Sequence, residues 1–291
     1  MFRSIADEVR GQFNYSNMMV KLIIINVAVF VVTAIVEAFA PTFYGQILPY
    51  IALPGDLEQL LYRPWTLVTH MFLHSGLWHL IYNMLIFHLF GRILGDLLGD
   101  QRVLPVYILG GLVGAGFYIL SFYLVSGIGS IAMGASAAIL AIVFAAVSTA
   151  PDYKINLILI GEVSIKYIGL VILFLDIIGS AKDVNQGGHI AHLGGTLFGF
   201  LFIYGIRNGV DLAEYFNRFI SFFDFEERRN KKLRAQRQKS PLKVAHRSER
   251  IPSKPESMQS KVDTILEKIK TAGYNSLTDE EKDVLYQASK N

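Results

Sequence analysis

Several long apolar stretches constrain this sequence more than any other feature. A helix that crosses the hydrocarbon core of a bilayer needs about 20 mostly apolar residues. Candidate stretches occupy residues 21–40, 76–95, 103–125, 131–150, 165–180 and 187–206. Charged residues make up only 18% of the chain and the mean hydropathy is +0.40, a combination that is rare in soluble domains. The sequence therefore predicts an all-α integral membrane protein with six transmembrane helices.

The first apolar stretch also carries a feature of cleavable signal peptides. Ala38-Phe39-Ala40 has the small-x-small form of a cleavage site. However, a signal core is about 7 to 15 residues long, the apolar run here is longer, and a long polar segment precedes it. We therefore expect this stretch to remain as the first span.

The distribution of basic residues predicts the orientation in the membrane. Lys and Arg crowd residues 228–237, shortly after the last predicted span. Positively charged residues near spans favour the cytoplasmic side. An even number of spans then places both termini in the cytoplasm and residues 41–64 outside. We expect a multi-pass protein of the cell inner membrane.

Composition divides the chain into four segments. Residues 1–20 form a cytoplasmic N-terminal segment, and residues 21–207 form the six-span domain. Residues 208–257 combine an aromatic-rich helix at 212–225 with a basic linker rich in Pro and Ser. The helix suits the headgroup layer, although a cytoplasmic extension of the last span is an equal alternative.

The fourth segment, residues 258–291, is predicted to be a small helical unit. Val262, Ile265, Leu266 and Ile269 share one helical face, and Gly273 is a plausible helix stop. Thr278 and Glu281 have the spacing of a capping box that opens a second helix. Two short helices seldom fold alone, so we expect this unit to dock on another surface.

Histidine and serine are the residues left for chemistry in the spans. The chain has no cysteine, which excludes thiolate catalysis and Cys-ligated metal sites. Polar side chains inside spans are costly and are functional candidates by default. Six histidines lie in or beside the spans, namely His70, His74, His79, His88, His189 and His192. For His70 and His88 taken singly, satisfaction by water or a backbone carbonyl is the favoured interpretation.

His79 and Asn83 are spaced i, i+4, so both project from one face of the second span. Two hydrogen-bond donors held side by side in a site with little water suit a developing oxyanion. The pair alone is a weak signal.

Ser136 and His192 are predicted to lie at a similar depth. Each lies about five residues from the external start of its span, or roughly 8 Å deep at about 1.5 Å per residue. A serine and a histidine at matched depth can act as nucleophile and base. The bland alternative is that Ser136 hydrogen-bonds within its own helix.

Rows of small residues favour close approach of these two spans. Ala137, Ala141 and Ala145 form a row on the fourth span, while His192, Gly195 and Gly199 share a face of the sixth. Small residues let membrane helices pack closely. On the bland alternative, the glycines only pack.

Three motifs in this order resemble the signature of rhomboid intramembrane serine proteases. They are HSGLWHLIYN at residues 74–83, GAS at 134–136 and AHLGGTLFG at 191–199. The resemblance implies a six-helix bundle with a Ser-His dyad that opens to the external side. It assigns Ser136 as nucleophile and His192 as general base, and it matches His79, Asn83 and the Ser136 backbone N–H to oxyanion-stabilising positions. His74 is similar to a supporting histidine, and Gly134, Gly195 and Gly199 match packing glycines.

Two positions depart from the family pattern. Ala137 follows the nucleophile where glycine is usual, and Leu140 stands where an aromatic residue is common. Neither change removes a chemical group, so we expect activity with an uncertain substrate preference. The C-terminal unit resembles a short extension on rhomboids of some Gram-negative bacteria.

The predicted function is hydrolysis of peptide bonds in or near the spans of other membrane proteins. The implied partners are transmembrane protein substrates and membrane lipids, with no cofactor, no metal and no nucleic acid. Asp176 is left open between orienting a histidine and being an interfacial carboxylate. The fifth span and residues 181–188 are candidate moving parts for substrate entry.

Three other functions remain in competition. A metal-dependent membrane oxygenase fits the histidine spacings in HMFLH and HIAH, although the sequence has few clustered carboxylates. A non-catalytic relative that binds membrane helices would have the same fold. A transporter is the weakest option, because the sequence shows no convincing internal repeat.

Overall fold

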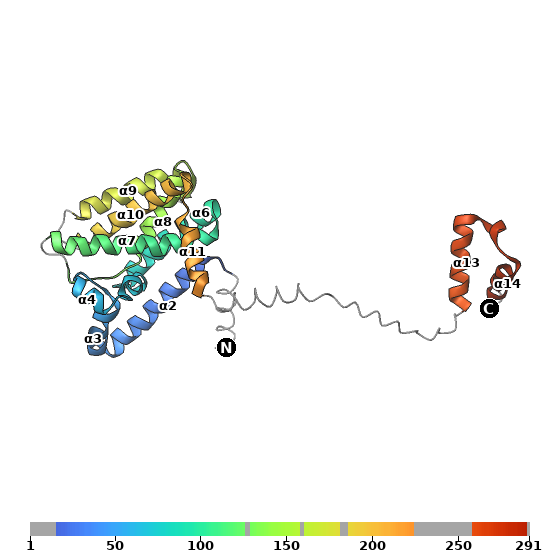
Figure 1. Ribbon diagram of the computed structural model, residues 1–291, viewed down its shortest axis with the longest axis horizontal. Coiled ribbons are helices and arrows are strands. Elements are labelled where there is room, and N and C mark those ends of the chain that lie inside the picture. The colour runs from blue at the N-terminus through green and yellow to red at the C-terminus, as the bar shows by residue number, and fades with distance from the viewer. Residues whose placement is uncertain (1–15, 126–128, 158–159, 181–185, 224–257, 290–291) are drawn as a thin grey trace. The chain divides into compact units, whose positions relative to one another are not determined.

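The computed structural model describes residues 16–125, 129–157, 160–180, 186–223 and 258–289, and the chain divides into two units at residues 229 and 230 (Figure 1). Three predictions fall outside the described residues. They are the N-terminal segment up to residue 15, the basic linker from 224 to 257, and the links at 126–128 and 181–185.

The first unit is a bundle of helices with two small antiparallel hairpins. Its first half contains α2 Met18–Phe39, α3 Pro41–Ile51, β1 Leu53–Pro54, α4 Leu57–Tyr62, α5 Thr66–Thr69, η1 His70–Phe72, α6 Leu77–Leu98 and η2 Asp100–Arg102. Its second half contains α7 Val103–Leu124, β2 Ile131–Ala132, α8 Ser136–Thr149, β3 Lys154–Leu157, β4 Gly161–Ser164, α9 Ile165–Ser180, α10 Gln186–Arg207 and α11 Leu212–Phe223.

Among the described residues, four helices are long and apolar enough to cross a bilayer. They are α2, α6, α10, and the continuous segment Asp100–Leu124 that η2 and α7 form together. The shorter α8 is apolar but has 14 residues, and α9 has 16. The predicted helical membrane fold is confirmed, whereas the count of six crossings stays a prediction.

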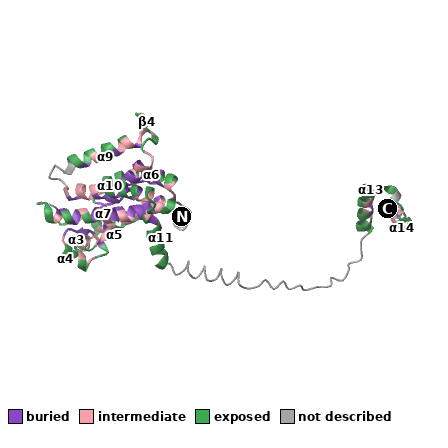
Figure 2. Ribbon diagram, turned by 45° about the horizontal axis from the view of Figure 1, so that its top comes forward, coloured by how far each residue is buried: buried purple, intermediate pink, exposed green. Residues whose placement is uncertain are grey.

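Helix α8 lies at the centre of the bundle. It packs against α6, α7, α9 and α10, and every residue from Ala137 to Val147 is buried. A helix that is apolar on all sides is stable only when other helices surround it. The outer helix α9 is more exposed than α7 and α10 (Figure 2).

The predicted start of the fourth span at residue 131 is wrong. Ile131 and Ala132 form β2, which pairs with Pro54 and Leu53 of β1, and the helix begins at Ser136. Gly134 between them has φ +141°, a conformation that ends regular structure and favours glycine. A short apolar strand cannot be told from a helix end by composition, which explains the error. Ser136 is thus the first helical residue, not one buried about five residues along a span.

A buried polar chain connects three segments of the bundle. The Asn26 side chain on α2 donates to the Tyr107 hydroxyl on α7 at 3.2 Å, and that hydroxyl donates to the Met71 carbonyl at 2.9 Å. Buried polar groups are costly unless they are hydrogen-bonded. This chain therefore fixes η1, which leads into the loop before α6, against α7.

Helix α11 is attached to the end of the bundle where α7 begins. Arg102 donates to Asp211 through Nε at 3.0 Å and through Nη2 at 2.7 Å. Asn217 donates to the Gln101 carbonyl at 3.0 Å. Three aromatic side chains of α11 are exposed, namely Tyr215, Phe219 and Phe222. Exposed aromatic residues suit a helix that lies in the headgroup layer.

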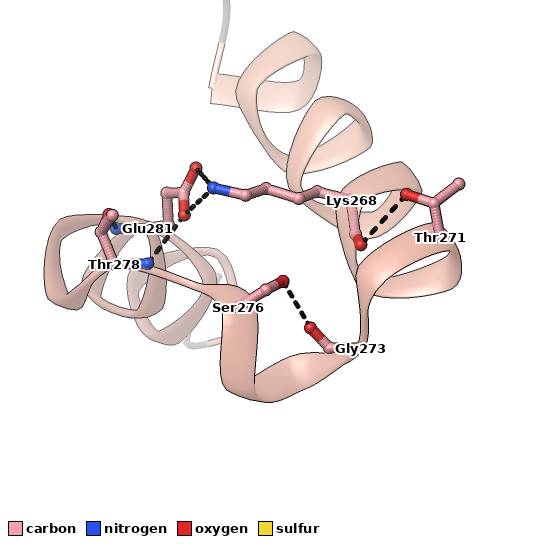
Figure 3. A network of polar contacts seen from close by, with 6 residues as sticks. All are labelled: Lys268, Thr271, Gly273, Ser276, Thr278 and Glu281. Atoms are coloured by element: carbon pink, nitrogen blue, oxygen red, sulfur yellow. Dashed lines mark hydrogen bonds and ion pairs between the residues drawn. The ribbon is translucent and has the colours of Figure 1, made fainter.

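The second unit consists of α13 Met258–Ala272, η3 Tyr274–Ser276 and α14 Asp279–Ala288. Gly273, with φ +80°, ends α13, and the capping box of Thr278 and Glu281 opens α14, which confirms both predictions. Lys268 joins the helices by donating to both carboxylate oxygens of Glu281 at 2.7 and 2.8 Å (Figure 3). Of the predicted apolar face, Ile265 is buried but Leu266 is 51% exposed.

Candidate active site

Ser136 owes its position to the turn that precedes α8. The backbone N–H of Gly134 donates to the His70 carbonyl at 2.9 Å, and the positive φ of Gly134 redirects the chain into the helix. The first N–H groups of a helix have no acceptor within the helix, and the helix dipole is positive at that end. Ser136 therefore stands where negative charge is favoured.

His192 projects from α10 toward this serine. Its Nε2 lies 2.6 Å from Ser136 Oγ, a hydrogen-bond distance. The side chain of His192 is 17% exposed. The structure thus brings together two side chains that are 56 residues apart in sequence.

Glycines let α10 approach α8 closely enough for this contact. A Cβ on Gly195 would lie 2.0 Å from the Ala137 carbonyl oxygen, and one on Gly199 would lie 2.5 Å from that of Ala141. Both distances are too short for any side chain without displacing backbone. The small-residue face of the sixth predicted span therefore packs directly against the alanine row of the fourth.

Two glycines on α7 contribute in the same way and were not identified from the sequence. A Cβ on Gly114 would lie 2.5 Å from the Ala137 Cβ, and one on Gly110 would lie 2.2 Å from the Ala141 Cβ. The sequence signal was present, because these glycines are spaced i, i+4. Ala137, one of the two departures from the family pattern, is accommodated by this missing side chain at Gly114.

His79 lies beside the turn that carries Ser136. A Cβ on Gly134 would be 3.2 Å from His79 Nε2 and 3.5 Å from Ser136 Oγ. The His79 Nδ1 accepts from the Ser75 backbone N–H at 3.5 Å and lies 3.1 Å from the Ser75 hydroxyl. Since Nδ1 accepts, the neutral ring carries its proton on Nε2, which makes Nε2 a donor on the Ser136 side. Sequence reasoning did not identify Ser75.

Asn83 and His74 each contact His79, Asn83 at its backbone carbonyl and His74 at its ring. Asn83 is buried one turn further along α6, and its Nδ2 donates to the His79 carbonyl at 2.8 Å. That bond occupies one of the two amide hydrogens. The buried His74 ring meets the His79 ring edge-on with centroids 5.2 Å apart. His74 therefore packs against the ring that it was expected to support.

The other two histidines near the first motif, His70 and His88, lie outside the pair formed by Ser136 and His192. His70 is buried with Nδ1 2.7 Å from the Thr66 carbonyl, and its own carbonyl holds Gly134. His88 is on the exposed face of α6. Within the described residues, neither side chain forms a hydrogen bond with Ser136 or His192.

Asp176 on α9 contacts both histidines of α10. Its Oδ1 lies 2.7 Å from His192 Nδ1 and 2.8 Å from His189 Nδ1. The side chain of Asp176 is 11% exposed, and the two imidazole rings meet edge-on with centroids 5.6 Å apart. The possible metal-ligand atoms of Asp176, His189 and His192 all lie within 4.8 Å of one another. In the part of the chain that the structure describes, these three residues form the one group with the types and spacing to hold a metal ion.

A small cavity borders the serine. Its volume is about 30 Å³, which is the space of about one water molecule. The lining includes residues of η1, of α7, of the GAS turn with the start of α8, and of α10, namely His70, Tyr118, Gly134, Ser136, Ala137 and Ala191. Water or a small side chain therefore fits beside the hydroxyl.

Comparison with known protein families identifies two regions of the chain. The family model of the Rhomboid domain matches residues 62–209, which contain every candidate site residue named above. A family of unknown function (DUF6576) matches residues 250–291, which include the second unit's helices.

Two curated relatives are similar to about half of this chain. A presenilin-associated rhomboid-like protein A, mitochondrial, from Danio rerio is 30% identical over 139 residues, which cover 47% of this chain and 36% of the relative. Rhomboid-related protein 1 from Caenorhabditis elegans is 32% identical over 157 residues, covering 50% and 41%. The matches thus span less than half the length of either relative.

Proposed function

The chain belongs to the rhomboid family, and from this premise we propose that it is a serine endopeptidase that hydrolyses peptide bonds in or near the transmembrane segments of other membrane proteins. The observation that carries the proposal is the 2.6 Å approach of His192 Nε2 to Ser136 Oγ. A hydroxyl within hydrogen-bond reach of a basic nitrogen is the arrangement that activates a serine nucleophile.

The reaction proceeds in two acyl-transfer steps. Ser136 Oγ attacks the carbonyl carbon of the scissile bond while His192 Nε2 takes the hydroxyl proton. His192 then gives this proton to the departing amine nitrogen as the C–N bond breaks, leaving an ester on Ser136. Water attacks the ester, its proton passes to His192, and the acid product leaves as the proton returns to Ser136 Oγ.

The oxyanion of each tetrahedral intermediate needs donors that are already in place. His79 Nε2–H, the free amide hydrogen of Asn83 and the backbone N–H of Ser136 supply them in this proposal. The positive end of the α8 dipole acts in the same direction. Donors positioned in advance in a site with little water contribute about 10² to 10³ each to the rate.

The membrane setting defines the class of substrate. A peptide carbonyl inside a helix is hydrogen-bonded, so we infer that substrates have spans with small or helix-weakening residues near the external face. The partners are therefore transmembrane proteins, with lipid around the bundle. We assign the protein to the inner membrane with both termini cytoplasmic, supported by the basic cluster at residues 228–237.

A serine-directed experiment tests the proposal. The purified protein in detergent is treated with a fluorophosphonate probe and is also reconstituted with a transmembrane protein substrate. We expect labelling and cleavage by the native protein and neither by Ser136→Ala. Cleavage by the Ser136→Ala variant at the native rate would reject the nucleophile, and loss of native activity with a metal chelator would favour the metal-dependent alternative.

A further inference from the structure

One carboxylate meets the far side of the catalytic histidine from a different helix. Asp176 is 9% exposed on α9, a helix whose neighbouring residues Leu175 and Ile177 are 59% and 51% exposed. Asp176 is thus turned inward, although the residues on either side of it in α9 are exposed. Its Oδ1 meets His192 Nδ1 at 2.7 Å, on the opposite edge of the ring from Ser136.

These contacts determine where the protons of both imidazoles lie. An ionised carboxylate has only acceptor sites, and one oxygen has room for two N–H donors. His192 Nδ1 and His189 Nδ1 therefore both donate to Asp176 Oδ1. A neutral imidazole has a single N–H, so Nε2 of His192 is left with its lone pair facing the Ser136 hydroxyl. That tautomer is the one that a general base requires.

We propose that Asp176 is a positioning residue for His192, one that fixes the tautomer and the ring orientation of the base and stabilises the imidazolium formed during acyl transfer. The inference rests on the proposed protease function and adds a carboxylate to the Ser136–His192 pair. Burial of Asp176 strengthens its attraction to the imidazolium of His192, because charges interact more strongly away from bulk water. His189 occupies the second acceptor site of the same oxygen and limits rotation of the carboxylate.

A purely structural role for Asp176 makes different predictions. If the carboxylate only joins α9 to α10, removing it lowers stability or substrate binding and leaves the chemical step unchanged. If it positions the base, removing it lowers kcat with little effect on KM, because the lost interaction matters most in the transition state. The kcat and KM of the full-length protein therefore separate the two roles.

The experiment compares three substitutions at this position in the purified, reconstituted full chain. Asp176→Asn keeps the size and removes the charge, Asp176→Ala removes the group, and Asp176→Glu restores a carboxylate. We expect Asn and Ala to lower kcat by at least about 10-fold with KM within about 3-fold of native, and Glu to recover part of kcat. Melting temperatures are measured in parallel, and the comparison uses each variant that melts within a few degrees of the native protein.

The matched control is Asp152→Asn, which removes an exposed carboxylate that pairs with Lys166 near the start of α9, away from the candidate site, and should retain native kcat. A native kcat in Asp176→Asn or Asp176→Ala would overturn the proposal, as would a loss confined to KM or no recovery with Glu. Ser136→Ala is assayed beside them. If that variant still cleaves, the proposed nucleophile fails, an outcome independent of Asp176.

Discussion

At the scale of single residues, the two histidines of α10 differ in what their Nε2 atoms meet. Both Nδ1 atoms lie within 2.8 Å of the same Asp176 oxygen, but of these two histidines only His192 hydrogen-bonds Ser136 in the part of the chain that the structure describes. Direction alone did not separate these histidines in the sequence, because residues three apart differ by only about 60° around a helix; depth and the face shared with Gly195 and Gly199 favoured His192. The contact to Ser136 now gives a third reason to assign the base to His192.

The first prediction concerns this pair. His192→Ala should abolish peptide hydrolysis and serine labelling without unfolding the protein, because the hydroxyl loses its proton acceptor. His189→Ala should keep measurable turnover. Both are measured by substrate cleavage and fluorophosphonate labelling of folded, purified variants. If turnover survived in His192→Ala and vanished in His189→Ala, the assignment of the base would be reversed.

Some residue contacts follow from sequence and others do not. The approach of Ser136 to His192 agrees with the rows of small residues read from the sequence, since such rows allow two helices to pack closely. The first helical residue of α8 was misplaced, because Ile131 and Ala132 have the composition of a span although they pair as a strand. The contact of Asp176 depends on how α9 rotates about its axis, which no local pattern determines.

At the scale of elements, the packing of α10 on α8 depends on missing side chains. A Cβ on Gly199 would lie 2.5 Å from the Ala141 carbonyl oxygen and 2.9 Å from the Ala145 nitrogen. Backbone atoms cannot rotate away, so the helices must separate. Separation at this point also moves His192 relative to Ser136.

The second prediction uses this contact. Gly199→Ala should destabilise the folded protein by about 1 to 3 kcal/mol, the usual cost of overpacking, and should lower turnover. Gly116→Ala on α7 is the matched control, because a Cβ there meets nothing within 4 Å and alanine favours helix. Unfolding in detergent and substrate cleavage are the measurements. Equal stability of the two variants would contradict the tight packing of α8 and α10.

The third prediction concerns the hairpin of α13 and α14. Hydrogen bonds from the Lys268 ammonium, followed by that from the Thr278 backbone N–H, lower the pKa of Glu281 from its ordinary value. A carboxyl with a lowered pKa in the folded state contributes stability above its ordinary pKa, and this contribution is lost as the pH falls through the folded value. After correction for the intrinsic exchange rate at each pH, the protection of amides in α13 and α14 of the full chain should therefore fall on acidification. Glu281→Gln should remove most of this pH dependence, and an unchanged dependence would contradict the role of the ion pair.

At the scale of the whole molecule, the apolar body and the basic segment after it predict the orientation in the membrane. The candidate site lies where β1, β2 and the start of α8 meet, in the half of the bundle that includes the predicted external segment 41–64. The basic residues 228–237 belong to the predicted cytoplasmic side. If the C-terminus is cytoplasmic, we therefore expect the candidate site to open on the external side.

The fourth prediction tests this topology with reporter fusions. A reporter at Asn291 should give a cytoplasmic signal, because Lys and Arg near the last span hold that side in the cytoplasm. A reporter inserted between α3 and α4 should give an external signal. An external signal at Asn291 would reverse the orientation and place the site on the cytoplasmic side.

The last prediction asks how much of the chain the chemistry needs. The candidate site residues all lie between His74 and Gly199, and the matched Rhomboid domain ends at residue 209. A chain truncated after Ser221 keeps the contacts of Arg102 with Asp211 and of Asn217 with Gln101, which attach α11 to the bundle. Truncation should therefore leave hydrolysis detectable, although expression or substrate recruitment falls.

The measurements for this truncation are membrane insertion, serine labelling and cleavage of a transmembrane substrate, with the full-length chain and its Ser136→Ala variant as controls. Complete loss of labelling in a folded, inserted truncation would mean that a part of the mechanism lies in the C-terminal residues.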